Sequence, residues 1–390
     1  MSALRTGGAP RAVRRSGFTI AADGSYAACL AEIAGPDGSA GPGGGGLLAE
    51  RWTLAGPEPY AVPLPGPQPE EPGTQVLALA DGRVLIRRRV AADRHSLSLL
   101  SPTGPGTGEL PLGTLAGDVR LLPPAPGAAY ALAWEEDADR TGIWRVHGTP
   151  DGVPELAMTV PGRCTGGVWL DRVGRLLAVD RELDGRTKAV AVDLHTARTS
   201  PLLQLTDDSD DRLLLAEPDS GLLLLRSDAT GEARLGWGVL GSRRPVRFPD
   251  ALRVPGVLLT PVAAQPGQIL MPEASVVALR AEVPGGAESL ALWRPGERRL
   301  HWRASPPGWL GAAGMWMPGD ELRLPYAADG LPCGLAAYDP PAGWPEPAAR
   351  AATGVVVHVP ARLPAPLPAT RRKWNVLPLQ QAPLAAAKAG

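Results

Sequence analysis

Short apolar runs separated by glycine and aspartate recur along most of the chain. The clearest unit spans residues 167–194, in which two apolar runs flank a tight turn at Val173-Gly174 and a third run follows at residues 187–194. Apolar runs of about four to eight residues that are bounded by turn residues predict β-strands. The unit therefore predicts an antiparallel β-meander.

The same order of strands and turns returns at residues 314–339, where Trp316 aligns with Trp169, and in weaker copies elsewhere. The turns before each second strand fall near positions 24, 82, 127, 174, 221, 274 and 319. One repeat length across a β-rich chain is typical of a β-propeller, whose blades bury their faces against each other. We therefore predict an all-β fold, a seven-bladed β-propeller of four-stranded antiparallel blades. A β-sandwich or two stacked β-domains is the alternative, because these also contain regular short strands.

The predicted organisation has three parts: a basic N-terminal segment (1–17), the propeller (18–360) and a short Pro/Ala-rich C-terminal tail (361–390). The predicted blades span residues 18–66, 74–117, 118–162, 163–206, 210–252, 255–306 and 309–360. Residues 355–359 are expected to complete the last blade or to close the ring. Residues 60–64 contain Pro63 and are expected to form an outermost strand, where proline is tolerated.

Composition agrees with many turns between strands. The 48 glycines and 44 prolines exclude a mainly helical protein, and an apolar fraction of 44% excludes a disordered one. Tryptophan recurs in most units and is expected to fill the spaces between blades. These residues are Trp134, Trp144, Trp169, Trp237, Trp293, Trp302, Trp309 and Trp316.

Charge and cysteine content bear on partners and location. A net charge of −1 provides no field that selects nucleic acid or an anionic membrane, so neither partner is expected. No apolar stretch is long enough to span a bilayer, and no signal peptide is recognised. Three widely separated cysteines fit a reducing compartment, so a cytoplasmic location is predicted. The triplet Arg87–Arg89 cannot be buried as a whole, because alternate strand residues face opposite sides.

The repeat resembles a known group of propellers. Trp169, Val173-Gly174, Leu177-Ala178 and Asp193-Leu194 match the Trp, turn, Leu-Ala and Asp-Leu pattern of TolB-type and prolyl-oligopeptidase-type propeller repeats. The resemblance covers most of residues 18–350 and implies the fold, while propellers as a class have unrelated activities. The hydrolase domain of the oligopeptidases is not expected here, since the sequence has neither a G-x-S-x-G motif nor room for that domain.

Candidate chemistry is sparse. None of the five histidines lies at an H-x-H or H-x-x-x-H spacing, so no catalytic, cofactor-binding or metal-binding residue is predicted. The acidic run at residues 207–211 lacks the glycine and glutamate of a calcium loop. It is expected to be a solvated link between the fourth and fifth blades, or a contact for the basic patch of a partner. Its candidate residues are Asp207, Asp208, Asp210 and Asp211.

The tail contains a second candidate, in which Arg371 and Arg372 precede Trp374 and Leu377. Large apolar residues are unusual in a free tail. Two interpretations stay open: the segment packs on the side of the propeller, or it docks on a protein partner with Trp374 and Leu377 as anchors.

These observations favour a protein without catalytic activity of its own. The expected function is a scaffold for protein–protein interaction through a loop face, the channel mouth or the tail, without a cofactor. One alternative is an accessory subunit that gates or positions a separate hydrolase or biosynthetic enzyme, which a neighbouring gene could encode. Another is an enzyme with a metal on the propeller axis.

Overall fold

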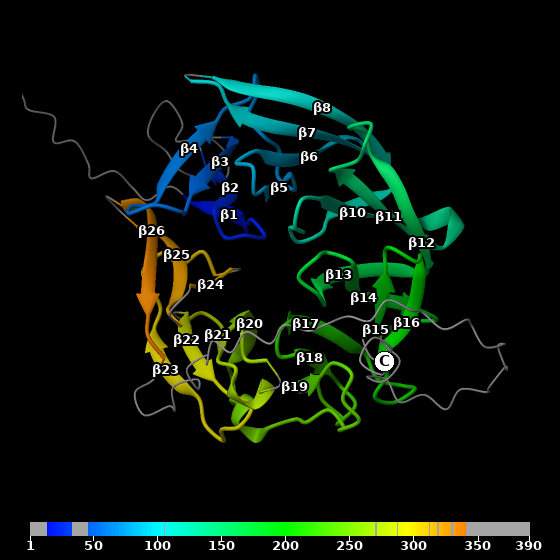
Figure 1. Ribbon diagram of the computed structural model, residues 1–390, viewed down its shortest axis with the longest axis vertical. Coiled ribbons are helices and arrows are strands. Elements are labelled where there is room, and N and C mark those ends of the chain that lie inside the picture. Colours follow the sequence, from blue (N-terminus) through cyan, green and yellow to red (C-terminus); the bar gives the residue numbers. More distant parts are fainter. Residues whose placement is uncertain are drawn as a thin grey trace, which may run out of the picture.

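A computed structural model describes residues 14–32, 46–104, 106–269, 271–286, 288–311, 313–317, 320–328 and 331–340. The predicted strand at residues 355–359 lies outside the described residues. Short strands dominate and stand in sheets around a common centre (Figure 1). The helical elements in the described part are three single 3₁₀ turns, η1 (Glu136–Ala138), η2 (Asp250–Leu252) and η3 (Pro272–Ala274). The all-β prediction is confirmed.

The first three sheets are four-stranded antiparallel meanders that follow one another along the chain. The first sheet contains β1 (Arg15–Ile20), β2 (Tyr26–Glu32), β3 (Leu47–Thr53) and β4 (Tyr60–Leu64). The second contains β5 (Gln75–Ala78), β6 (Val84–Ala91), β7 (Arg94–Pro102) and β8 (Thr107–Ala116). The third contains β9 (Asp118–Leu121), β10 (Ala129–Glu135), β11 (Arg140–His147) and β12 (Glu155–Pro161). In the first sheet β4 is outermost, as predicted from Pro63, and β1 begins earlier than the predicted start at residue 18.

The next sheet has seven strands in two antiparallel groups. The first group is β13 (Arg163–Trp169), β14 (Leu176–Leu183), β15 (Arg186–Asp193) and β16 (Arg198–Leu203). The second is β17 (Asp211–Glu217), β18 (Leu222–Ser227) and β19 (Arg234–Val239). A single parallel pair, Lys188 with Asp211, joins them. The predicted fourth strand of the second group is wrong, because the chain after β19 returns only as an isolated bridge between Arg247 and Trp237.

The last two sheets complete the described part of the ring. One is a four-stranded meander of β20 (Leu258–Ala264), β21 (Val277–Glu282), β22 (Ser289–Trp293) and β23 (His301–Ala304). The other has three described strands, β24 (Met315–Trp316), β25 (Leu322–Ala328) and β26 (Leu331–Tyr338).

Glycines form the repeating turns. Gly24, Gly82, Gly127, Gly174 and Gly221 stand at five of the predicted turn positions, and all have a positive φ, for example 80° at Gly82. A left-handed backbone favours glycine because a side chain would clash there. At Gly82 a Cβ atom would also lie 3.1 Å from the ring of Tyr26. The expected tight turn near residue 274 is instead a longer connection that contains η3.

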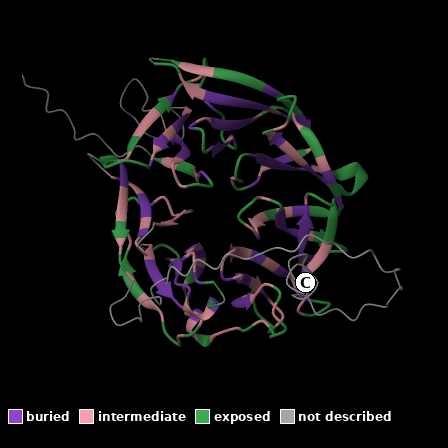
Figure 2. Cartoon of the chain, in the orientation of Figure 1, coloured by how far each residue is buried: buried purple, intermediate pink, exposed green. Residues whose placement is uncertain are grey.

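Apolar side chains from neighbouring strand groups form the core. Each of the seven buried clusters in the described part joins two neighbouring groups. The middle strands of the sheets are mostly buried, while the inner and outer strands carry many half-buried or exposed residues (Figure 2). Phe18 and Trp52 of the first sheet pack with Ala327 and Cys333 of the last described one. Packing between the first and last sheets therefore closes the ring.

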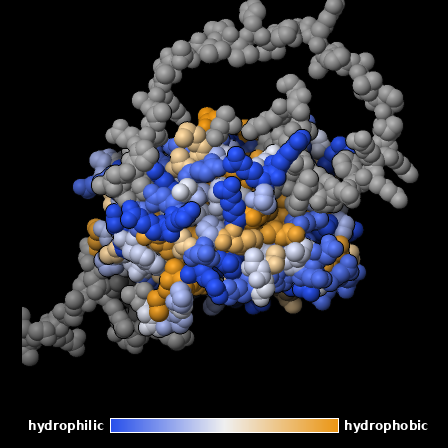
Figure 3. All heavy atoms as spheres, turned by 90° about the horizontal axis from the view of Figure 1, so that it is seen from below, coloured by the Kyte–Doolittle hydropathy of each residue, from blue (hydrophilic) through white to orange (hydrophobic). Residues whose placement is uncertain are grey.

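The tryptophans do not all contribute to this core. Trp237, Trp293 and Trp309 are buried, as expected. Trp302 is 45% exposed, which corrects the expectation of a buried ring. It lies on β23, the outer edge strand of its sheet, which has a neighbouring strand on one side only. The outer wall accordingly mixes hydrophilic and apolar surface (Figure 3).

Candidate functional site

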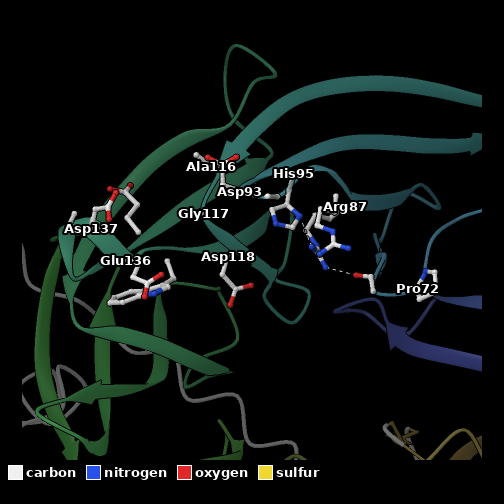
Figure 4. Close-up of a pocket in the computed structure, with 15 residues that line it drawn as sticks. Pro72, Arg87, Asp93, His95, Ala116, Gly117, Asp118, Glu136 and Asp137 are labelled. Carbon is white, nitrogen blue, oxygen red and sulfur yellow. Dashed lines mark hydrogen bonds between the residues drawn. The ribbon is translucent and has the colours of Figure 1, made fainter.

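A pocket of about 830 Å³ opens between the second and third sheets (Figure 4). Its walls come from the β6–β7 turn, the β8–β9 link, and the end of β10 with η1. Successive strands in a meander run in opposite directions, so these connections share one end of the ring with the β16–β17 link. We call the surface formed by these four connections the loop face.

The alternation of β6 places Arg87 in this pocket. Arg87 is buried, whereas Arg89 is exposed two residues further on. Arg88 points to the other side and donates to Glu70 Oε2 at 2.8 Å and to Glu109 Oε1 at 2.6 Å. The prediction that the triplet cannot be buried as a whole is therefore confirmed.

The Arg87 guanidinium donates to two neutral acceptors. Nη1 lies 2.7 Å from His95 Nδ1, and Nη2 lies 2.6 Å from the carbonyl oxygen of Gly73 (Figure 4). A guanidinium is only a donor, so Nδ1 of His95 must accept and the ring proton must sit on Nε2. Burial, helped by the charge of Arg87, lowers the pKa of His95. Both effects favour the neutral imidazole that this hydrogen bond requires.

Arg87 forms no ion pair among the described residues. Burial lowers its pKa, while the charge of Asp118 acts in the opposite direction. Asp118 directs its carboxylate elsewhere, to Arg163 at 3.3 Å and to Arg120 at 3.5 Å. The site can therefore accept an anion, because the buried cation has no carboxylate of its own.

Carboxylates gather at the mouth of the pocket. Asp93, Glu136 and Asp137 are all exposed and line it. Within the described ranges none of the three forms an ion pair. Acidic side chains thus surround the opening, while the arginine lies deeper.

A smaller pocket of about 360 Å³ lies near the centre of the ring, at the end opposite the loop face. Val168, Leu214 and Leu215 of the inner strands β13 and β17 line it. Arg172, also in the lining, is paired with Asp219 at 2.5 Å and with Glu217 at 3.1 Å. This smaller pocket is more apolar than the pocket around Arg87, and its arginine already has acidic partners.

The acidic run at residues 207–211 is only partly available to a partner. Asp207 and Asp208 are exposed on the loop face, and their role in binding stays a prediction. Asp210 accepts a hydrogen bond from the Thr187 amide at 2.8 Å. Asp211 is fully buried and paired with Lys188 Nζ at 2.9 Å, so its expected solvated position is wrong. The carboxylate is needed inside to balance the lysine charge.

The tail candidates Arg371, Arg372, Trp374 and Leu377 lie outside the described residues. In the part that the structure describes, no group of three or more His, Cys, Asp or Glu side chains could hold a metal ion. No described helix is long and apolar enough to cross a membrane.

Comparison with known proteins identifies the fold. No protein-family model matches the chain, and no curated protein matches it in sequence. The β-propeller domain of the Trilobed protease from Pyrococcus furiosus matches with a TM-score of 0.52 and 10% identity, over 85% of this chain and 95% of that one. A prolyl endopeptidase structure matches with a TM-score of 0.51 and 14% identity, over 85% of this chain. The fold is a β-propeller.

The predicted resemblance to TolB-type and prolyl-oligopeptidase-type propellers is thereby confirmed at the level of fold. TolB from Acinetobacter baumannii also matches, with 13% identity over 81% of this chain and 80% of that one and a TM-score of 0.42. This propeller spans only 48% of the prolyl endopeptidase chain.

Sequence reasoning missed the pocket around Arg87. One signal was present, because Arg87 shares a strand face with Leu85 and so stands at an inward position. The proximity of Glu136 and Asp137 had no such signal, since it depends on how two neighbouring sheets are placed.

Proposed function

We propose that the chain forms a seven-bladed propeller. The seven-stranded sheet divides into two meanders that share a single residue pair, which supports two separate blades. The described strands then make seven groups around the ring. One buried apolar cluster between each group and the next supports the same count.

We propose that this propeller is a scaffold without catalytic activity of its own, and that it docks a protein partner on the loop face. The observation that carries the proposal is the gathering of exposed carboxylates there. Asp93, Glu136 and Asp137 surround the pocket, and Asp207 and Asp208 follow on the β16–β17 link. These carboxylates form no ion pair within the described ranges, and such an acidic surface favours a partner with a basic surface through electrostatic complementarity.

Affinity purification from the native cell tests this proposal. The double variant Glu136→Lys/Asp137→Lys reverses two charges on the loop face. A matched control, Asp151→Lys/Glu155→Lys, reverses two exposed charges at the other end of the same meander. We expect one partner to co-purify with the wild type and the control and to be lost from the loop-face variant, with salt-dependent binding.

Two results would contradict the proposal. The first is retention of the same partner by the loop-face variant at wild-type levels. The second is turnover by the purified chain on a panel of esters, peptides and lactones.

An accessory role beside a separate hydrolase is the second candidate. It is favoured by the match to prolyl endopeptidases, in which the region like this chain covers 48% of a longer protein. The same purification distinguishes the two candidates, because an accessory subunit would bring down a hydrolase whose activity changes when the propeller is removed.

A further inference from the structure

Arg87 is a buried cation whose neighbours are neutral. It is 8% exposed, and its two terminal nitrogens donate to the His95 ring and to the Gly73 carbonyl. Its Nε atom is buried and has no acceptor among the residues that the structure describes. A buried charge is unfavourable unless an opposite charge and hydrogen bonds compensate it. The described residues provide the hydrogen bonds only in part and provide no carboxylate contact.

The adjacent arginine shows that this strand can receive such compensation. Arg88 pairs with Glu70 at 2.8 Å and with Glu109 at 2.6 Å, and these contacts raise its pKa. Two consecutive arginines of β6 thus differ in their contacts with carboxylates. The arginine that faces the pocket, Arg87, is the one with no acidic partner in the described part of the chain.

Positive and negative side chains occupy different parts of the pocket. Arg87 lies in the buried part of the lining, whereas Asp93, Glu136 and Asp137 are exposed at the mouth (Figure 4). Arg89, also exposed, offsets only part of this negative charge. A ligand that satisfies both regions must present a negative group inside and a positive group outside.

We propose that this pocket binds a small zwitterionic ligand, with its carboxylate against Arg87 and its cationic group among the rim carboxylates. A carboxylate fits because a guanidinium offers paired N–H donors in one plane. A phosphate dianion fits less well, since it would have to pass the acidic rim. A simple cation would leave Arg87 uncompensated. This site does not depend on the protein partner proposed above, because the ligand is a small molecule that the purified chain binds alone.

Calorimetric titration of the purified full chain tests the site. The probes are acetate, butylammonium, 4-aminobutyrate, 6-aminohexanoate and inorganic phosphate. We expect one of the two amino acids to bind at least about tenfold more tightly than acetate, butylammonium or phosphate. The better of the two gives the separation between the charged groups.

Variants locate the binding. Arg87→Leu is expected to reduce the affinity of that amino acid to the level of butylammonium. Arg244→Leu changes a remote, 71% exposed arginine in the same way and should leave the affinity unchanged. If Arg87→Leu does not fold, the surface variant Asp93→Asn/Glu136→Gln replaces it. That variant should weaken the amino acid about tenfold without weakening acetate, because it removes only negative charge from the rim.

Three outcomes would overturn the inference. They are the absence of binding by both amino acids, acetate or phosphate binding as tightly as the amino acids, and unchanged binding by the folded Arg87→Leu or rim variant. Each can occur while partner docking on the loop face is intact, so the two proposals fail separately.

Discussion

Two cations of the propeller have different partners: Lys188, which is half-buried beside a fully buried carboxylate, and Arg87, which is itself buried. Lys188, on β15, contacts Asp211 Oδ2 at 2.9 Å and Ser209 Oγ at 3.1 Å. Asp211 in turn accepts from the Ser227 hydroxyl at 2.6 Å and from the Leu205 amide at 2.9 Å. Arg87, on β6, has two neutral acceptors and no carboxylate contact among the described residues.

The difference separates a structural ion pair from a cation that can still bind an anionic ligand. The pairing of Lys188 with Asp211 stands where β15 meets β17, so it fastens two strand groups together. Arg87 stands beside an open pocket. The charge of Lys188 is compensated by a carboxylate of the same chain. By our proposal, the charge of Arg87 is compensated only when a ligand binds.

The largest expected effect is on the structural pair. Lys188→Met leaves Asp211 as an uncompensated buried charge, which we expect to cost about 3–5 kcal/mol in the free energy of unfolding. Urea unfolding followed by tryptophan fluorescence measures it. Arg244→Met, an exposed control, should change that free energy by less than about 0.5 kcal/mol. Similar losses in both variants would show that Lys188 is not a structural cation.

A second effect at the same junction depends on pH. Asp180 of β14 is buried and accepts from the Leu213 amide at 3.0 Å. Burial raises its pKa to about 6, although the Leu213 amide and the charge of Arg212 oppose this. In the unfolded chain the same carboxyl titrates near pH 3.9. As pH falls through 6 the folded state therefore takes up the proton first, and this group adds stability down to about pH 4.

Asp180→Asn removes this titration. Relative to the variant, the wild type should gain stability between pH 7 and pH 4, by roughly 3 kcal/mol at most. Melting temperatures of both proteins across this range measure the gain. If the melting temperatures of the two proteins changed in parallel with pH, the raised pKa of Asp180 would be contradicted.

The repeat was predictable because it rests on local chemistry. Gly24, Gly82 and Gly174 mark turns by a conformation that other residues rarely adopt, and Pro63 marks an outer strand. Features that depend on neighbours far along the chain were not predictable. The burial of Asp211 follows from the approach of Lys188, which the acidic run itself does not reveal.

The same limit explains the missed pocket and the group β17–β19, which departs from the four-strand pattern. After β19 only Arg247 pairs back, with Trp237, and it also lies over that ring at 5.2 Å. A strand prediction that rests on apolar runs cannot detect such an isolated bridge. The pocket combines Arg87 with Asp118 and Glu136 from the next sheet, so only the packing of two sheets brings its charges together.

The smallest expected effect is on the open site. Arg87→Leu removes a buried cation that contacts no carboxylate among the described residues, and such a replacement by an apolar residue is often neutral. It also leaves His95 Nδ1 and the Gly73 carbonyl without their donor, which is unfavourable. The two contributions oppose each other, so we expect the free energy of unfolding to change by no more than about 1 kcal/mol. Urea unfolding beside Lys188→Met makes the comparison direct. A loss at Arg87 as large as that at Lys188 would mean that Arg87 is also part of the structural framework, and the contrast between the two cations would be lost.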